Sequence, residues 1–354
     1  MSHPRKTKNH RRAAGKHVAG RRTVRVLFSC VGRRVELIRA FRNAGAALGI
    51  TLEVHGADTS RMTPGGQHVD KCHTIAPINR HHASRLLAIV KREKIDLLVP
   101  LIDSELQWIA DAEPRFREAG CTALISSPEV VGACRDKLAT FAALSAAKID
   151  TPKTSSWDEA LVRQRHRFPY FLKPRAGSAA MGNYRINSLD ELKVIGARVP
   201  EAIVQEFVTG VEHTLDVYTG LNGVPRCVVP RRRIEVRAGE VSKALIVKDP
   251  GIMDIGIRVA SALGDCRGVI TVQCIVTPRG RIRVIEINPR FGGGVPLSIH
   301  AGADFPKWIL SEQLGKKPRI NPTGFRADVA MLRFDDSVFL PHASRLLDEK
   351  DRRR

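Results

Sequence analysis

Hydrophobic residues in the first third of the chain follow two alternating patterns. Short apolar runs rich in β-branched residues, typical of buried strands, occupy residues 23–29, 51–58, 95–103 and 121–126. The intervening segments carry apolar residues at helical spacing, over residues 30–45, 83–94 and 105–120. Strands that alternate with helices in this way predict βαβ units and a parallel sheet. We therefore expect an α/β domain over residues 23–128.

Beyond residue 128 the pattern changes. Residues 127–152 are helical in pattern, and strand-like segments then follow at 168–175, 183–188, 202–220, 224–237 and 268–290. Turn sequences "GLNG" and "TPRG" separate several of them and predict antiparallel pairing. We expect an α+β unit of two lobes, residues 129–204 and 205–340. Residues 1–22 and 341–354 are expected to be basic tails.

Polar residues stand at the carboxyl ends of the predicted parallel strands, where such sheets bind ligands. They are Asp58, Asp103 and Glu105. A role in binding substrate and a role as helix caps or turn formers are equally consistent with this position. The turn after the first strand holds Gly32 but lacks G-x-G-x-x-G, so it does not predict NAD binding.

The composition narrows the class of protein. No run of eighteen apolar residues is present, so we expect no membrane span. The seven cysteines include no C-x-x-C pair, which argues against a disulfide framework or a zinc ribbon and favours a reducing, cytoplasmic location. The histidines show no zinc-enzyme spacing.

The formal charge of +22 raises the question of nucleic acid as a partner. Eight of the basic residues fall within the first 22 positions, and no recognition motif for DNA or RNA accompanies the others. A basic cleft for anionic substrates such as nucleotides explains the remainder equally well. The N-terminal segment has no apolar signal core, and we expect a disordered tail. An organelle transit peptide and a start codon placed too far upstream are the alternatives.

The strand-like stretch "IRVIEINPRFGGG" carries the chemistry of greatest interest. Residues at i and i+2 share one face of a strand, so Glu286 and Asn288 point together and Ile285 and Ile287 face the other side. Gln273 lies on the preceding strand and is expected beside them. Oxygen-bearing side chains gathered on one face suit Mg²⁺, or Mn²⁺, together with phosphates.

Arg290 follows this strand, where a guanidinium is able to hold a transferring phosphoryl group. Glycines 292–294 then allow backbone amides to approach an anion closely. The alternative is a structural ion pair between Arg290 and Glu286.

Further candidates for nucleotide binding lie upstream. Lys173 ends an aromatic strand ahead of a loop that contains Gly177, Ser178 and Gly182, and Lys137 is a second candidate contact for phosphate. The stretch "QEFV" is similar to a hinge whose backbone pairs with adenine, and Glu212 would then take the ribose hydroxyls.

In this order the motifs resemble those of the ATP-grasp superfamily, over residues 23–335. The stretch "EINPRFGGG" followed by "SIHAGADFP" is most similar to members related to the large subunit of carbamoyl-phosphate synthase and to the ligase of pyrrolysine biosynthesis. The resemblance implies a pre-ATP-grasp α/β domain with a parallel sheet, then an α+β ATP-grasp domain with two lobes. It also implies ATP and Mg²⁺ as cofactors.

The resemblance further implies the role of each residue. Lys137 and Lys173 would hold ATP phosphates, under the loop from Gly177 through Ser178 to Gly182. The adenine hinge would comprise Glu206, Phe207 and Val208, with Glu212 at the ribose. The metal would bind Gln273, Glu286 and Asn288, and Arg290 would stabilise the γ-phosphate together with Lys173. Candidate substrate contacts are Asp103, Glu105, Arg232, Arg233 and Lys243, and the sequence does not rank Arg231, Arg232 and Arg233.

The implied reaction is ATP-dependent activation of a small carboxylate as an acyl phosphate, which an amine then attacks. Carboxylation, or synthesis of an acyl-phosphate product, is the first alternative, although the chain is too short for a complete carbamoyl-phosphate synthase. A non-catalytic regulator that binds nucleotide or nucleic acid is the second. We expect small-molecule substrates, no membrane partner and a homodimer, the commonest assembly of soluble enzymes.

Overall fold

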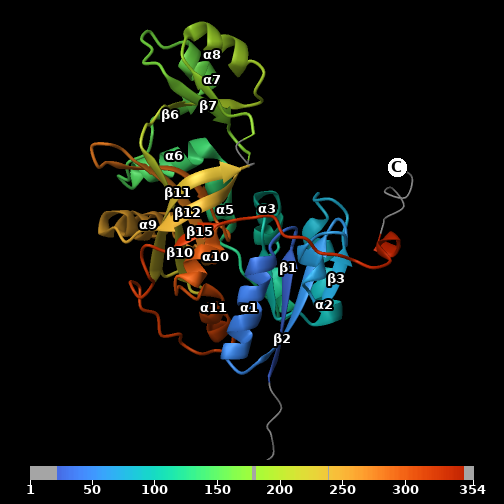
Figure 1. The fold of residues 1–354 in the computed structure, drawn as a ribbon. Coiled ribbons are helices and arrows are strands. Elements are labelled where there is room, and N and C mark those ends of the chain that lie inside the picture. The colour runs from blue at the N-terminus through green and yellow to red at the C-terminus, as the bar shows by residue number, and fades with distance from the viewer. Residues whose placement is uncertain (1–21, 178–180, 238, 347–354) are drawn as a thin grey trace, which may run out of the picture.

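The computed structural model describes residues 22–177, 181–237 and 239–346 (Figure 1). An α/β domain comes first along the chain, and two lobes with antiparallel sheets follow. In Figure 1 the small lobe stands above the rest of the molecule, and the α/β domain lies beside the large lobe. No helix of the described chain is long and apolar enough to cross a membrane.

The α/β domain contains a five-stranded parallel sheet in the order β3-β2-β1-β4-β5, as the alternating pattern predicted. Its strands are β1 (Thr23–Ser29), β2 (Thr51–Asp58), β3 (Lys71–Thr74), β4 (Leu97–Pro100) and β5 (Thr122–Ala123). Its helices are α1 (Val35–Ala47), α2 (His82–Glu93), α3 (Asp103–Asp111) and α4 (Glu113–Glu118), with a 3₁₀ turn at Gly65–Gln67. The order reverses between β1 and β4, so the loops after these two strands flank the crevice where such sheets bind ligands.

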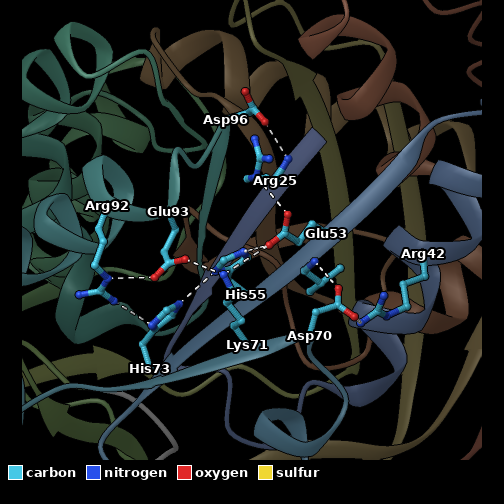
Figure 2. Close-up of polar contacts among 11 residues, drawn as sticks. Arg25, Arg42, Glu53, His55, Asp70, Lys71, His73, Arg92, Glu93 and Asp96 are labelled. Atoms are coloured by element: carbon cyan, nitrogen blue, oxygen red, sulfur yellow. Dashed lines mark hydrogen bonds and ion pairs between the residues drawn. The ribbon is translucent and has the colours of Figure 1, made fainter. Parts of the chain in front are cut away.

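Strand β3 lacks the apolar alternation of its neighbours, and a polar network attaches it to the domain (Figure 2). The imidazoles of His55 and His73 are 3.0 Å apart between Nδ1 and Nε2. Lys71 Nζ donates to Glu93 Oε2 at 2.9 Å, and Arg92 Nη2 lies 3.1 Å from His73 Nδ1. These contacts join β2, β3 and α2, and they replace the apolar packing that the strand does not have.

The small lobe contains a four-stranded antiparallel sheet in the order β6-β9-β7-β8. Its elements are β6 (Thr154–Ser156), α7 (Trp157–Leu161), β7 (Tyr170–Pro174), β8 (Tyr184–Ile186), α8 (Leu189–Gly196) and β9 (Ala202–Glu206). Tyr170, Leu172, Ile186 and Leu192 belong to a core of its own.

The large lobe contains a six-stranded antiparallel sheet in the order β14-β13-β10-β11-β12-β15. The strands are β10 (Val211–Gly220), β11 (Cys227–Arg237), β12 (Glu240–Ile246), β13 (Gly268–Val276), β14 (Ile282–Asn288) and β15 (Ala330–Leu332). The helices are α5 (Pro128–Arg135), α6 (Lys137–Ala146), α9 (Pro250–Leu263), α10 (Val295–His300) and α11 (Phe305–Gln313), and a 3₁₀ turn spans Ala343–Leu346. Helices α5 and α6 precede the small lobe in sequence, yet their apolar residues share a core with α9 and this sheet.

One hydrophobic core continues from the α/β domain into the large lobe. It contains Phe28 and Phe41 of the first domain together with Phe291 and Phe305 of the lobe. The rings of Phe41 and Phe291 meet edge to face, with centroids 6.1 Å apart. Helix α1 lies against α10 and α11, so the loop after β1 is held close to the segment that follows β14 (Figure 1).

Candidate functional site

A cavity of about 470 Å³ opens between the small and large lobes. Its walls come from β7 and β9 on one side and from β10, β13 and β14 on the other. Most of the residues expected from the sequence to bind nucleotide, metal or substrate line it: Asp103, Lys137, Lys173, Gly177, Glu206, Phe207, Val208, Glu212, Arg233, Gln273, Glu286, Asn288 and Arg290. We refer to this space as the nucleotide cavity. Gly182 lies next to its lining residue Met181 and has a left-handed φ of 73°, and Ser178 is outside the described residues.

The oxygen-bearing side chains form one wall of the nucleotide cavity. Glu286 and Asn288 lie on the same face of β14, with Asn288 Nδ2 3.5 Å from Glu286 Oε1. Gln273 on β13 is the cross-strand neighbour of Glu286 in the sheet register. Within the described chain, the Glu286 carboxylate has no ion-pair partner within 4.0 Å, and it therefore faces the cavity with its charge available.

Strand β14 contains a bulge that the sequence pattern did not predict. The register moves from Gln273–Glu286 to Cys274–Val284, so Ile285 is an extra residue in the strand. Ile287 is buried on the opposite face, as expected, but Ile285 lines the nucleotide cavity beside Glu286. The expectation that both isoleucines face away was therefore wrong for Ile285, because the bulge interrupts the period-two alternation.

Two lysines face this acidic wall. Lys173 at the end of β7 is only 4% exposed, and its Nζ lies 3.5 Å from the carbonyl of the bulged Ile285. Lys137 Nζ donates to the carbonyl of Gly177 at 3.3 Å. Burial lowers the pKa of Lys173 to about 8, with Glu286 opposing the shift and Lys137 adding to it. Burial also lowers the pKa of Lys137. Both lysines lie in the field of the Glu286 carboxylate, and Lys137 also lies in that of Asp103 and Asp136. Burial still lowers the pKa of both lysines, so an anion bound beside them would stabilise their charged forms.

The hinge region supplies the apolar end of the cavity. Phe171 and Phe207 lie there with ring centroids 6.5 Å apart, and the guanidinium of Arg185 lies 4.9 Å from the Phe207 centroid. The Glu206 carboxylate accepts two hydrogen bonds from Arg283, at 2.8 and 2.9 Å. The Glu206 carboxylate is therefore occupied by Arg283, and the backbone N–H of Glu206 donates to the carbonyl of Lys153 at 2.9 Å. Only its backbone carbonyl is left for the predicted contact with a ligand. Sequence reasoning missed Arg283, which belongs to β14 and is distant from Glu206 along the chain.

The structure distinguishes the three consecutive arginines of β11. Arg231 is 1% exposed and donates to both oxygens of Asp216, at 2.7 and 2.9 Å. Arg233, two residues on and on the same face, lines the nucleotide cavity and donates to Glu212 at 2.6 Å. Arg232 points to the other face and is exposed. Burial raises the pKa of Glu212, while Arg233 opposes that shift and Glu286 adds to it.

Arg290 pairs with a carboxylate of a different domain. Its Nη2 donates to Asp103, the first residue of α3, and its Nη1 donates to the carbonyl of Phe291 at 3.0 Å. The alternative pairing of Arg290 with Glu286 is therefore not formed. Both members of the Arg290–Asp103 pair line the nucleotide cavity, and they also separate it from a second one.

The second cavity, of about 390 Å³, lies between the α/β domain and the large lobe. Five arginines line it against two acidic residues: Arg33, Arg34, Arg231, Arg233 and Arg290, with Asp103 and Glu240. We refer to it as the arginine cavity. Arg33, Arg34 and Glu240 were not identified from the sequence, because nothing local distinguishes them from solvent-exposed charges.

Four of the candidates lie away from both cavities. The buried Glu105 carboxylate accepts from Leu101 N and His82 Nε2, both at 2.9 Å, and it fixes the turn that leads into α3. Lys243 pairs with Glu235 at 2.6 Å, and Arg232 is exposed as described. Asp58 accepts from Gly32 N at 2.9 Å, as expected of a residue that stabilises a turn.

The cleft lies between two lobes that each contain an antiparallel sheet. Lysines and apolar rings line one side of it, and carboxylate and amide oxygens line the other. This arrangement is typical of a class of nucleotide-binding proteins. The sequence comparisons name that class. Residues 134–294 match the family model of the ATP-grasp domain, and residues 26–124 match that of the PylC-like N-terminal domain. Together the two matches span most of the described residues, and the chain contains an ATP-grasp domain preceded by a PylC-like N-terminal domain.

Solved structures share the fold at low sequence identity. The biotin carboxylase domain of 2-oxoglutarate carboxylase from Hydrogenobacter thermophilus, a dimer in complex with MgADP, ADP and bicarbonate, is 17% identical with a TM-score of 0.67, covering 86% of this chain and 73% of that one. The L-amino acid ligase of Bacillus licheniformis is 19% identical with a TM-score of 0.64, covering 83% and 75%. The N5-carboxyaminoimidazole synthetase of Staphylococcus aureus, in complex with ADP, is 14% identical with a TM-score of 0.66, covering 84% and 79%. No curated protein matches the sequence.

Proposed function

We propose that this protein is an ATP- and Mg²⁺-dependent ligase that activates a small carboxylic acid as an acyl phosphate and transfers the acyl group to an amine. One observation carries the proposal. A single cavity gathers the buried Lys173, the half-buried Lys137, Arg290 and three oxygen-bearing side chains around an apolar end of aromatic and aliphatic residues. Cations for phosphates, oxygen ligands for a hard metal ion and flat apolar walls for a base are what Mg-ATP requires of its site.

The residues present fit a magnesium ion. Gln273, Glu286 and Asn288 place oxygen atoms on one wall, and no thiol or imidazole lines this cavity among the described residues. Among the described residues no cation lies within 4.0 Å of the Glu286 carboxylate, so its oxygens are available to ligate a metal ion. When bound, Mg²⁺ supplies neutralisation of the phosphate charge.

The chain's own residues supply the rest. Lys137 and Lys173 bind phosphate oxygens, and Arg290 stabilises charge on the phosphoryl group as it leaves ADP. In the first step a carboxylate oxygen of the acid bonds to the γ-phosphorus, and the bond between that phosphorus and the β–γ bridging oxygen breaks to release ADP. In the second, the amine nitrogen bonds to the acyl carbon, inorganic phosphate leaves, and the nitrogen loses a proton. Asp103 positions the Arg290 guanidinium at the boundary between the two cavities.

The known neighbours of the fold include both an amino acid ligase and carboxylases. In carboxylation, ATP would activate bicarbonate, whereas in the favoured reaction it activates a small carboxylic acid. Product mass separates the two. The predicted homodimer is a separate matter, which light scattering of the purified chain tests.

The decisive experiment measures ADP release from Mg-ATP with pooled amino acids, other small carboxylates and amines. Wild type is compared with Glu286→Ala and with Glu235→Ala, a control carboxylate that pairs with Lys243 outside both cavities. We expect substrate-dependent ADP release that is lost only in Glu286→Ala, and an amide product identified by its mass. Release with bicarbonate alone would replace ligation by carboxylation. Salt-sensitive binding of nucleic acid without turnover would favour a regulator.

A further inference from the structure

The arginine cavity adjoins the nucleotide cavity at the point where the acid would be activated. Asp103, Arg233 and Arg290 line both spaces. Beyond Arg290 the arginine cavity extends to Arg33 and Arg34, in the loop between β1 and α1, and to glycines 292–294. An acid whose carboxylate lies beside Arg290 therefore has its remaining atoms within reach of this loop.

Positive charge exceeds negative charge at one end of the arginine cavity only. Three of its arginines have a carboxylate each: Arg231 pairs with Asp216, Arg233 with Glu212, and Arg290 with Asp103.

At the far end, by contrast, Arg33 and Arg34 share the single carboxylate of Glu240 with Arg333, which lines a small recess beside the cavity rather than the cavity itself. The nitrogen-to-oxygen distances are 3.9 Å for Arg33, 3.7 Å for Arg34 and 3.0 Å for Arg333. The exposed Glu36 lines only a small recess beside the cavity, and no ion pair joins it to these arginines within the described chain. Two positive charges thus stay uncompensated where the α/β domain meets the large lobe.

Within this group, Arg34 combines low exposure with a guanidinium that is free to bind a ligand. Its side chain is 16% exposed, and its nearest carboxylate oxygen is 3.7 Å away, beyond hydrogen-bond distance. Within the described residues its guanidinium donates no hydrogen bond, although five N–H groups are available. These N–H groups reach the open space of the arginine cavity, where a bound anion would accept charge-assisted hydrogen bonds from them. Burial lowers the pKa of Arg34, with Glu240 opposing that shift, as expected for an incompletely compensated cation.

The glycines after Arg290 make room for the arginines. A Cβ on Gly293 would lie 2.9 Å from Arg34 Nη1, and one on Gly294 would lie 2.2 Å from Arg231 Nη1. The sequence had suggested that these glycines admit an anion to the backbone. The contacts indicate that the absence of side chains on these glycines leaves room for the guanidiniums. Arg34 can therefore lie directly against the loop.

We infer that the acid substrate carries a second anionic group, a carboxylate or a phosphate, and that Arg34 binds it at the far end of the arginine cavity. The inference rests on the proposed ligase function and specifies its substrate class. A monocarboxylic acid would bring only one anionic group, which would lie beside Arg290. The excess positive charge near Arg34 and Glu240 would then stay without a partner.

Hydroxylamine, a small amine that converts acyl phosphates to hydroxamates, allows the acid to be tested without knowledge of the natural amine. Matched pairs distinguish the two sources of charge: glutamate with glutamine and succinate with succinamate for a carboxylate, and phosphoserine with serine for a phosphate. The variants are Arg34→Ala, Arg34→Lys and the control Arg39→Ala. Arg39 is on α1, the helix that follows Arg34, and it contacts His68 and lines neither cavity.

We expect wild type to favour the dianionic member of at least one pair. Arg34→Ala should raise its KM about 10- to 100-fold, the loss of a charge-assisted contact, with little change in kcat. The KM of the neutral partner should stay the same. Arg34→Lys should restore part of the preference, and Arg39→Ala should match wild type. A preference for the neutral members, or one that survives Arg34→Ala, overturns the inference.

A second measurement does not depend on turnover. Calorimetry follows binding of succinate and of inorganic phosphate to the chain with Mg²⁺ and a non-hydrolysable ATP analogue already bound. Binding that Arg34→Ala abolishes supports the inference, whereas binding of neither anion, or binding indifferent to Arg34, contradicts it. Failure of wild type to bind the ATP analogue would instead refute the proposed function. The two failures are therefore distinguishable.

Discussion

The two adjoining cavities differ in how their charges are arranged. In the nucleotide cavity, lysines face a carboxylate that has no ion-pair partner within 4.0 Å in the part of the chain that the structure describes. In the arginine cavity most guanidiniums are already paired, and only the end near Glu240 has an excess. The first arrangement suits a ligand that brings its own metal ion and phosphates. The second arrangement suits selection among substrates. Most of its charges are already neutralised by fixed ion pairs, so an anionic group is favoured at one position only.

The largest effect is expected from the unpaired carboxylate of the nucleotide cavity. Glu286→Gln keeps the size of the side chain but removes its charge, and we expect turnover to fall by at least about 10²- to 10³-fold, the scale at which lost electrostatic stabilisation is usually observed. Steady-state ADP release checks it. Asn222→Asp, a change of charge in a loop that lines neither cavity, should leave the rate unaltered. A Glu286→Gln enzyme of normal rate would show that the oxygen wall is not a metal site.

The buried pair beneath the arginine cavity should control stability instead. Asp216 is 0% exposed, accepts from Arg231 twice and also accepts from Ser298 Oγ at 2.6 Å. Asp216→Asn leaves a buried guanidinium uncompensated, and we expect the free energy of unfolding to fall by about 3 kcal/mol. Urea denaturation measures this loss. A change below about 0.5 kcal/mol would be of the size seen for surface substitutions and would contradict the pairing.

The glycine run offers a steric test of the same cavity. Gly294→Ala places a methyl group 2.2 Å from Arg231 Nη1, so the loop or the arginine must move. A loss of about 2 kcal/mol is expected, as for other overpacked interiors. Gly132→Ala is the matched control, because its Cβ would lie 3.6 Å from Gln107 and it sits within α5. That change should stabilise the chain by up to about 1 kcal/mol.

Ligand binding in the two cavities should depend on pH to different extents. Lys173 has a pKa of about 8, so the folded chain loses this proton well before an unfolded lysine does. Between pH 8 and 10.5 the unfolded state binds more protons, and the nucleotide-free chain should become more stable as pH rises. Affinity for ATP should change in the opposite sense and weaken by up to about tenfold per pH unit, because phosphate needs the charged lysine. Lys173→Arg should remove both trends. Binding in the arginine cavity should stay nearly constant over this range, since guanidiniums keep their protons.

The smallest effect lies outside both cavities, in the network of Figure 2. Burial lowers the pKa of His73, with His55 and Arg92 adding to the shift and Glu93 opposing it. An unfolded histidine therefore takes up a proton first as pH falls below about 6.5, and the α/β domain should lose stability there. His73→Gln should flatten this dependence in thermal melts. A melting temperature of wild type that does not change between pH 7 and 5.5 would contradict it.

The sequence predicted the nucleotide cavity far better than the arginine cavity, for a physical reason. Glu286, Asn288, Gln273 and Lys173 occupy strands whose local pattern fixes their faces, and the structure brings these side chains into one space. The bulge at Ile285 was not predictable, because it depends on the register of a partner strand. Arg34 meets Glu240 and Gly293 only through packing of distant segments, and no short-range pattern records such a contact. Strand β3 escaped prediction because polar contacts rather than apolar alternation hold it.

The continuous core around Phe41 and Phe291 has a consequence for how the molecule can be divided. Removing the α/β domain would strip α10 and α11 of their covering and expose aromatic surface to water, so a shortened chain starting near residue 125 should aggregate. The small lobe has a core of its own and shares far less with its surroundings. Inheritance of the α/β domain and the large lobe as one piece follows from this packing, whereas insertions or exchanges are better tolerated in the lobe that stands above them.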